Sequence, residues 1–210
     1  MKILKKLLGK LIRILYRFVY RFIPCQEKTI LFISFHGRGY SDNPMAIHQY
    51  LSKHSQYADY RCIYAIKNHK QKKLKIENAR IIEYFSIAYF FYLARSKYWI
   101  ANCKLPKYVL KKDSQVYLQT WHGTPLKKLA HDIEVPEGTT FYRSEMSVEE
   151  MRSTYDNDVS KYNYMISPSA FTTEVFQSAF AIERERLIET GYPRNDILSN
   201  YNSDDIKKIK

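Results

Sequence analysis

The sequence predicts an α/β domain built on a mostly parallel sheet, and three observations lead to this prediction. Short apolar runs with strand character alternate along the chain with amphipathic stretches of helical length. Hydrophobic residues make up 45% of the chain and aromatic residues 15%, which is too much burial capacity for a disordered protein. The length of 210 residues fits one domain with its own core, with room for an appendage.

The first 24 residues form a basic leader, which we expect to be an amphipathic helix. Its positive charges at positions 6, 10, 13, 17 and 21 are three or four residues apart, so they share one helical face. Leu, Ile, Val and Phe side chains form the opposite face, and Pro24 ends the pattern. Because the charges interrupt every turn, the leader fits neither a membrane-spanning segment nor the apolar region of a signal peptide.

The charge of the chain indicates what the leader does. The net charge is +13, and residues 1–24 hold seven basic residues and no acidic one, so about half of the excess lies there. A helix with a basic and an apolar face is typical of an anchor lying in a membrane surface and attracted to anionic lipid. The alternative is a helix packed on its own domain or on a partner. Since no RNA- or DNA-binding motif occurs, we do not expect nucleic acid as a partner.

Beyond the leader, the alternation of patterns assigns the remaining elements in order. Strands are expected at residues 29–35, 60–66, 79–84, 98–102, 115–121, 164–167 and 187–189. Helices are expected at residues 44–52, 87–96, 124–131, 148–155 and 170–180, and a further helix after Asp204. Residues 138–141 are expected to be a mobile loop. In open α/β sheets ligands bind beyond the carboxyl ends of the strands, so the candidate functional residues are those that follow strands.

The first strand-end motif is FHGRGYSDNP, residues 35–44. Its two glycines allow unusual dihedral angles and close backbone approach. Asn43 is expected to cap the following helix, and Pro44 suits the first helical position. The loop would present His36 and Arg38 where a ligand arrives. The alternative is a tight turn with incidental polar residues.

The second motif is QTWHGTPLKK, residues 119–128, in which His122 closes a strand. A turn, a helix cap, a helix start and two lysines are expected to follow at Gly123, Thr124, Pro125, Lys127 and Lys128. The unpaired N–H groups of that helix start would bind an anion, reinforced by the lysines. A histidine beside such a site is well placed to act as a general base, because its ordinary pKa lies near neutrality. The alternative is a buried structural histidine with solvated lysines.

The third motif is GYPRND, residues 191–196, in which Arg194 follows the last predicted strand. Its planar guanidinium can clamp a phosphate, or it can pair with Asp196, and the sequence leaves both readings open. No P-loop, dinucleotide-binding or zinc-protease motif occurs, and the three cysteines lack metal-type spacing. We therefore expect reduced thiols and neither a metal nor a cofactor.

Taken together, these motifs resemble the CDP-glycerol:poly(glycerophosphate) glycerophosphotransferase family, the polymerases and primases of wall teichoic acid. Four blocks carry the resemblance in the order that the family shows: SFHGRGYSDNPMAIHQYL (34–51), TWHGTPLKKL (120–129), SPSAFTTEVFQSAF (167–180) and GYPRNDIL (191–198). The resemblance implies one Rossmann-like half of a GT-B architecture, in which two such domains face each other across a cleft. It also implies transfer of glycerol phosphate from CDP-glycerol to a lipid-linked polyol phosphate acceptor, at the cytoplasmic face of the cell membrane.

In that family the residue at the position of His122 is the proposed base that deprotonates the acceptor hydroxyl, and His36 would lie nearby. The residues that we expect to bind substrate phosphates are Arg38, Gly123, Thr124, Lys127, Lys128 and Arg194. The expected domains are a membrane-surface helix at residues 1–24 and an acceptor-side domain at residues 25–210. The family places CDP-glycerol binding in a second domain after the GYPRND block, which we expect this chain to lack, so that a second chain would supply it. The alternative is a non-catalytic membrane-bound module that holds acceptor lipid or a partner enzyme.

Overall fold

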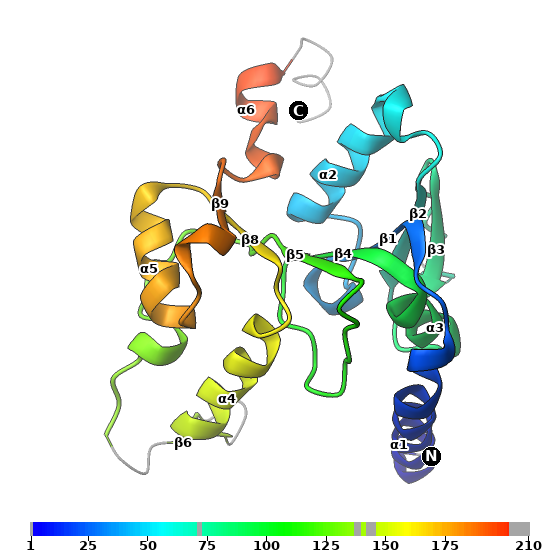
Figure 1. Cartoon of the computed structure of the whole chain (residues 1–210), viewed down its shortest axis with the longest axis horizontal. Helices are drawn as coiled ribbons and strands as arrows, with labels where there is room; N and C mark the ends of the chain where they lie inside the picture. Colours follow the sequence, from blue (N-terminus) through cyan, green and yellow to red (C-terminus); the bar gives the residue numbers. More distant parts are fainter. Residues whose placement is uncertain (1, 71–72, 137–139, 142–145, 202–210) are drawn as a thin grey trace.

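The computed structural model describes residues 2–70, 73–136, 140–141 and 146–201, and a parallel sheet crosses its centre (Figure 1). Seven strands lie in the order β3-β2-β1-β4-β5-β8-β9, and all neighbours are parallel. They are β1 (Gln26–Ile33), β2 (Arg61–Ile66), β3 (Ala79–Glu83), β4 (Ser96–Ala101), β5 (Val116–Gln119), β8 (Tyr164–Ser167) and β9 (Leu187–Glu189). A separate antiparallel pair is formed by β6 (Thr140–Phe141) and β7 (Met146–Ser147). The predicted α/β class is confirmed.

The strand order reverses between β1 and β4. From β1 the chain moves outward through β2 to β3, and it then returns to pair β4 with the other edge of β1. The loops after β1 and β4 therefore diverge, and such a switch point leaves a crevice at the carboxyl ends of the two strands. Ile33 pairs with Ala101, and Ala101 pairs with Gln119, so the ends of β1, β4 and β5 lie level. Residues that follow these three strands are thus brought together.

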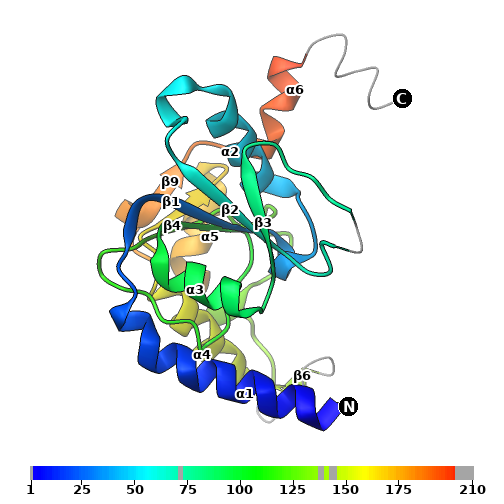
Figure 2. The same ribbon diagram turned by 90° about the vertical axis from the view of Figure 1, so that its right-hand side faces the viewer.

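Helices cover both faces of the sheet (Figure 2). They are α1 (Lys2–Val19), α2 (Asp42–Lys53), α3 (Ile87–Arg95), α4 (Val148–Val159), α5 (Ala170–Phe180) and α6 (Ile197–Asn200). Alternate residues of β1 point to opposite faces, as strand geometry requires. Leu31 and Ile33 enter the larger core with residues of α3, whereas Ile30 and Phe32 enter the smaller core, against which α2 packs. This two-sided burial explains the nearly continuous apolar run at β1.

Helix α1 is fixed to the domain on one side and exposed on the other. The hydroxyl of Tyr16, a buried residue, donates to the main-chain oxygen of Leu110 at 2.8 Å. Lys112 Nζ donates to the main-chain oxygen of Ile23, just after the short helix η1 (Tyr20–Phe22). The exposed apolar residues fall at helical spacing: Leu7, Leu11, Ile14, Leu15, Phe18 and Phe22. Within the described part of the chain, no helix combines the length and apolar character that crossing a bilayer requires.

Most predicted elements are present with boundaries shifted by a few residues, but two differences affect the site. The helix predicted at residues 124–131 is wrong, because the chain there is irregular until the short helix η4 (Ala130–Asp132). Leu126 is 94% exposed, so this segment has no apolar side to bury, and burial supplies most of the stability of helices in proteins. Helix α2 begins at Asp42 with Ser41 as its N-cap, so Asn43 does not cap it and Pro44 is not its first residue.

Two further predictions touch residues outside the described part of the chain. Of the predicted loop at residues 138–141, residues 138 and 139 are not described, whereas Thr140–Phe141 form β6. The helix predicted after Asp204 lies wholly outside the described residues.

Candidate active site

His122 follows β5, and its side chain is exposed at the carboxyl edge of the sheet. Its Nδ1 lies 2.6 Å from the main-chain oxygen of Asn102, the residue that follows β4. A carbonyl oxygen can only accept a hydrogen bond, so in the neutral imidazole Nδ1 carries the proton and donates it. Nε2 is then the nitrogen with a lone pair. This is the tautomer that a general base requires.

The peptide before His122 is held in a strained conformation. Trp121 has a φ of 50°, and its ring stacks on the imidazole with centroids 4.5 Å apart. Its N–H donates to Oε1 of the buried Gln119 at 3.0 Å, and its oxygen accepts from Nδ2 of the buried Asn43 at 3.1 Å. A left-handed non-glycine residue costs about 1–3 kcal/mol and persists only where its surroundings fix it. The turn was expected at Gly123, but the residue with positive φ is Trp121.

The loop after β1 concentrates the same kind of strain. Positive φ values occur at Phe35 (44°), His36 (54°), Gly37 (81°) and Asp42 (62°). At Gly37 a side chain would not fit, because a Cβ atom there would lie 2.7 Å from Cβ of Tyr84. The N–H of Phe35 donates to Oδ1 of Asn102 at 2.8 Å, which ties this loop to the end of β4. Strain that two neighbouring loops share at one sheet edge is typical of a functional site.

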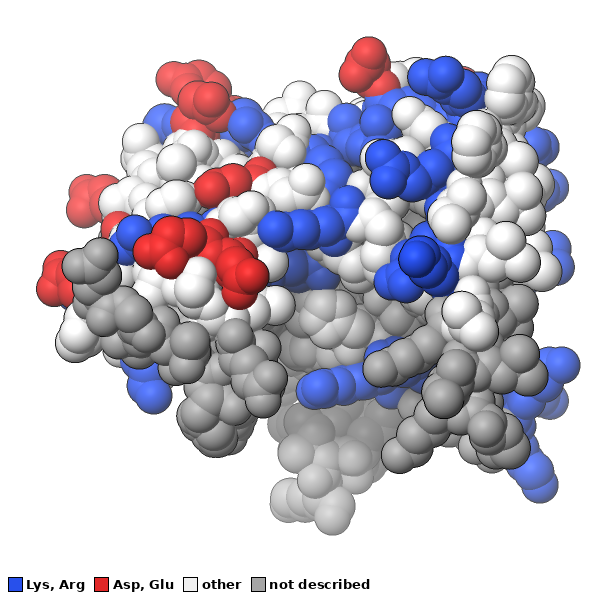
Figure 3. All heavy atoms as spheres, turned by 90° about the horizontal axis from the view of Figure 1, so that it is seen from below, with Lys and Arg blue, Asp and Glu red and all other residues white. Residues whose placement is uncertain are grey.

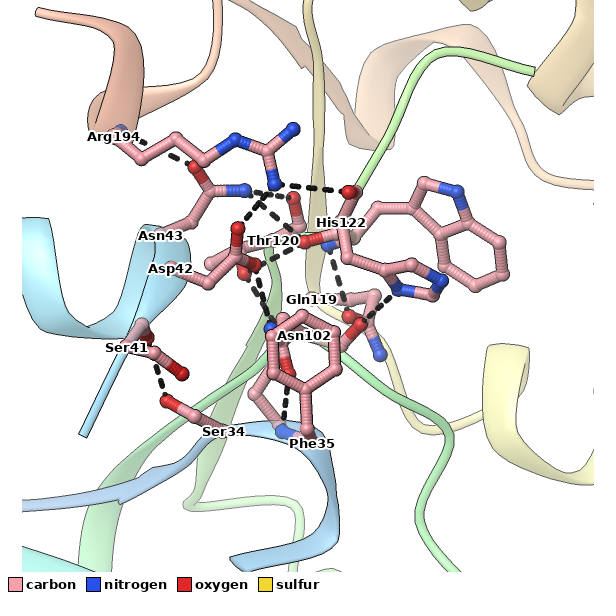
Figure 4. A network of polar contacts seen from close by, with 12 residues as sticks. Ser34, Phe35, Ser41, Asp42, Asn43, Asn102, Gln119, Thr120, His122 and Arg194 are labelled. Carbon is pink, nitrogen blue, oxygen red and sulfur yellow. Dashed lines mark hydrogen bonds and ion pairs between the residues drawn. The ribbon is translucent and has the colours of Figure 1, made fainter. Parts of the chain in front are cut away.

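A closed ring of interactions joins four segments at this edge (Figure 4). Nδ2 of Asn102 donates to Oδ2 of Asp42 at 2.5 Å, and Oδ1 of Asp42 pairs with Nη1 of Arg194. The same Nη1 donates to the main-chain oxygen of His122 at 2.9 Å, and the contact between His122 and Asn102 closes the ring. The Asp42 carboxylate is only 6% exposed, so this pair is shielded from water. The ring fixes both the backbone and the imidazole of His122.

Arg194 was expected to clamp a phosphate or to pair with Asp196, and its observed partner is Asp42. The reason is that α2 packs against the short helix η6 (Pro193–Asn195). The N–H of Arg194 donates to Oδ1 of Asn43 at 3.2 Å, which holds the two segments together. Asn43 thus uses its side chain for contacts with other segments, which explains why it does not cap α2.

His36 is half-buried in a positively charged environment. Burial is the main cause that lowers its pKa, and the charges of Lys67, Arg38 and Lys104 lower that pKa further. The ring of Phe35, the residue before His36, lies 5.8 Å from the imidazole of His122 between centroids, so the two loops are neighbours. A neutral histidine among cations marks a place where an anion is stabilised.

Lys104 is part of this environment and is itself unusual. Burial lowers the pKa of Lys104 to about 8. Its Nζ lies 3.3 Å from the ring centroid of Tyr155 and donates to Oγ1 of Thr154 at 2.8 Å, so α4 holds it in place. Both Lys104 and Lys67 were missed by sequence reasoning. Lys67 directly follows β2, and the strand-end criterion applied to every strand would have found it.

Sequence comparison assigns the family. A model of the CDP-Glycerol:Poly(glycerophosphate) glycerophosphotransferase family matches residues 14–210. The chain belongs to this glycerophosphotransferase family. It is 39% identical over 192 residues to a teichoic acid poly(glycerol phosphate) polymerase of Bacillus spizizenii, with 90% of this chain and 46% of the relative covered. It is 37% identical over 177 residues to a teichoic acid glycerol-phosphate transferase of Staphylococcus aureus, with 83% and 43% covered.

Solved structures of a wall teichoic acid polymerase share the fold. A variant of the wall teichoic acid polymerase TagF that was soaked with CDPG matches with a TM-score of 0.85 and 35% identity, covering 94% of this chain and 47% of that chain. A second TagF variant matches with a TM-score of 0.84 and 34% identity. The predicted Rossmann-like fold is thereby confirmed. The chain spans about half the length of these structures and of the two relatives above.

The other residues predicted to bind phosphate lie in the irregular segment after His122. Without a helix start, the described part of that segment lacks the N–H anion site that was expected there. Lys128 instead pairs with Glu134 at 2.5 Å. A phosphate role for Gly123, Thr124, Lys127 and Lys128 therefore stays a prediction. Among the described residues, no group of three His, Cys, Asp or Glu side chains is placed to hold a metal ion.

Proposed function

We propose that this chain supplies the acceptor side of a transferase that moves glycerol phosphate from CDP-glycerol to a membrane-linked teichoic-acid-type acceptor. The observation that carries the proposal is His122, which is exposed at the strand switch point with its Nδ1 proton donated to Asn102. That contact leaves Nε2 as a proton acceptor. The names of the relatives support the same reaction class.

In the proposed reaction, Nε2 of His122 takes the proton from the terminal hydroxyl of the acceptor. The hydroxyl oxygen attacks the phosphorus of CDP-glycerol that carries glycerol, and a new P–O bond forms. The bond from this phosphorus to the bridging oxygen breaks, and its electron pair leaves with CMP. The main-chain oxygen of Asn102 stabilises the imidazolium by accepting its Nδ1 proton in a hydrogen bond. The imidazolium then returns the proton to CMP or to solvent.

Charge on the transferred group needs electrostatic stabilisation besides a base. We assign this role in the chain to the cationic surroundings of His36, namely Arg38, Lys67 and Lys104. Lys127 and Lys128, in the irregular segment after His122, would add charge from the other side of His122. The donor nucleotide would be held by a second domain or a second chain, since the relatives are about twice as long.

The exposed apolar residues of α1 favour one further candidate function. A non-catalytic module that binds acceptor lipid or a partner enzyme would need the fold and the basic surface but not the base. We would measure CMP release from CDP-glycerol on liposomes that carry a glycerol-phosphate-primed lipid, with the chain alone and with the C-terminal half of a homologue. Release that His122→Ala abolishes supports the transferase. Acceptor binding that survives His122→Ala, with no release under either condition, supports the module.

We also propose that the chain lies on the cytoplasmic face of the membrane as a peripheral protein. On the face drawn in Figure 3, Lys and Arg side chains lie in the middle and on the right, whereas most of the visible Asp and Glu side chains lie on the left. The exposed apolar stripe of α1 lies beside these charges, a combination that suits anionic lipid. Because Tyr16 fixes α1 to the domain, membrane binding would also set the orientation of the crevice.

Phe18→Asp tests the membrane proposal, because Phe18 is 70% exposed within the apolar stripe. We expect it to weaken sedimentation with anionic liposomes at least about tenfold, since it removes buried area and adds a repelled charge. Tyr50→Asp, at a 53% exposed position on α2, is the matched control and should bind as the unmodified chain does. Equal binding by both variants would mean that α1 packs against a protein partner instead.

A further inference from the structure

Asp158 is a buried carboxylate that the proposed reaction does not use. It lies near the end of α4, has no exposed surface and belongs to none of the strand-end motifs. Oδ2 accepts from the hydroxyl of Tyr162 at 2.6 Å, and Oδ1 accepts from the N–H of Leu105 at 3.1 Å. Burial raises the pKa of Asp158 to about 6. Burying a carboxylate is costly, so a position that keeps one is a candidate for a specific role.

The first contact of Asp158 leads to the peptide before His122. The phenol of Tyr162 donates to the carboxylate, so its oxygen is left to accept, and it accepts from Nε2 of Gln119 at 3.2 Å. The amide of Gln119 is thereby oriented, with Oε1 turned to the N–H of Trp121 at 3.0 Å. Because a carboxylate can only accept, it makes Tyr162 donate and leaves the phenol oxygen to accept from Gln119, whose Nε2 also contacts the hydroxyl of Tyr117 at 3.1 Å.

The second contact of Asp158 leads to the group that orients the imidazole. Residues 102–105 form a short segment directly after β4. At its end, the N–H of Leu105 donates to Asp158. The same segment carries the oxygen of Asn102, which accepts from Nδ1 of His122 at 2.6 Å. It also carries the oxygen of Cys103, which accepts from Nε2 of Gln119 at 3.3 Å. Both branches therefore converge at His122.

We propose that Asp158 is a positioning residue for His122. Through Tyr162 and Gln119 it holds the peptide that precedes the imidazole, and through Leu105 it holds the carbonyl that selects the Nδ1–H tautomer. It touches no substrate. The inference rests on the proposed function, in which His122 is the base, but its structural part is measured without any reaction.

Two substitutions interrupt the relay in different ways. Asp158→Asn keeps the size of the side chain but replaces one acceptor by a donor. If its NH₂ group faces Tyr162, the phenol oxygen accepts from that group, and Gln119 loses one of the acceptors that orient its amide. Tyr162→Phe removes the hydroxyl and adds no donor. The matched control is Asp156→Asn, the same change on the same helix, where the carboxylate is 53% exposed and contacts His131.

The readout is long-range ¹H–¹⁵N NMR of the imidazoles in the whole chain, with the His122 signals identified from their loss in His122→Gln. We expect the Nδ1–H tautomer at His122 in the unmodified chain and in Asp156→Asn. In Asp158→Asn and Tyr162→Phe we expect a mixture in which Nε2–H is populated. In the reconstituted CMP-release assay, the same two variants should lose about 10-fold in kcat, because losses of this size follow when the residues that orient a functional histidine are replaced. KM for CDP-glycerol should be nearly unchanged.

The outcomes separate this inference from the proposed function. An unchanged tautomer and unchanged kcat in both folded variants would overturn the positioning role even if His122→Ala abolishes release. A changed tautomer in a chain that never releases CMP would keep the positioning role and remove the transferase. If Asp158→Asn does not fold, Tyr162→Phe decides the matter, because it removes one oxygen and leaves the packing of the ring intact.

Discussion

His36 and His122 look equivalent in the sequence, since each follows a strand and precedes a glycine, but the structure gives them different surroundings. His122 is exposed, and its proton is fixed on Nδ1 by a main-chain oxygen. His36 is half-buried, and burial together with neighbouring cations lowers its pKa. One side chain is thus prepared to accept a proton, and the other is kept neutral in a positive field.

The difference between them arises from what holds each loop. The peptide of Trp121 is fixed by two buried amide side chains, and the ring of ion pair and hydrogen bonds fixes His122 itself. The loop at His36 is held by the fit of Gly37 against Tyr84, by main-chain bonds and by the side chain of Asn102, which accepts from the N–H of Phe35 but does not contact the imidazole of His36. The contacts around His122 fix which ring nitrogen carries the proton. The packing around His36 fixes only where the loop lies. We infer that catalysis depends on the first loop and affinity for phosphate on the second.

The strongest test of the difference between His122 and His36 is to remove each imidazole in turn. His122→Ala should lower kcat for CMP release, in the reconstituted enzyme, by about 10²–10⁴-fold, the range for a positioned general base. His36→Ala should cost less than about 10²-fold and should act mainly on KM. His131→Ala is the control, because His131 pairs with Asp156 at 2.6 Å outside the ring. Equal losses for His36 and His122 would show that the two histidines share the proton transfer.

Much of this site follows from the sequence, and each part that does not follow has its own physical cause. The strands were predictable because two-sided burial imposes apolar runs such as the one at β1. Both histidines were predicted because ligands bind beyond strand ends, and the structure places each of them after a strand of the sheet. The prediction of a helix at residues 124–131 was wrong. Thr124 and Pro125 favour a helix start, but the segment has no apolar face to bury. A local signal is insufficient where tertiary packing gives no support.

The ring was missed for a different reason. Arg194 and Asp42 are 152 positions apart, and only the packing of η6 on α2 brings them together. The sequence suggested Asp196 as the partner of Arg194, because it is the nearest acidic residue along the chain. No sequence pattern connected Arg194 with Asp42. Asn102 was overlooked because its strand end carries no glycine, although its main-chain oxygen is the atom that sets the tautomer of His122. Every residue has a main-chain oxygen, so the residue type at a position does not show that its oxygen makes such a contact.

The next largest effect should come from breaking the ring. Arg194→Ala leaves the shielded Asp42 carboxylate without its charged partner, so we expect the free energy of unfolding to fall by about 2 kcal/mol. Arg184→Ala is the control, since Arg184 and Glu189 form a pair that is 49% and 33% exposed, and it should cost less than about 1 kcal/mol. Urea unfolding at pH 7 measures both. A similar small cost for the two variants would mean that the ring does not constrain His122.

The smallest effect, a pH dependence, sharpens what His36 does. The pKa of His36 lies below its ordinary value of 6.5, so the folded state binds the proton less tightly than the unfolded state. Its contribution to stability is therefore fully present above pH 6.5 and is lost as the pH falls toward the lowered value. His36→Asn should flatten the decrease in unfolding free energy below pH 6.5. The slope that remains should combine His48, whose pKa burial also lowers, with an opposing contribution from Asp158, whose raised pKa favours the folded state as the pH falls through about 6.

The same titration tests whether the positive field at His36 receives a phosphate. Inorganic phosphate or CMP bound beside Arg38, Lys67 and Lys104 would offset their charges and so raise the pKa of His36, which NMR follows directly. Lys104→Met removes one of those charges and should raise the same pKa before any anion is added. It should also reduce the further rise on adding phosphate. An unchanged His36 titration in the presence of saturating phosphate would place the anion nearer to Lys127 and Lys128, the site expected from sequence.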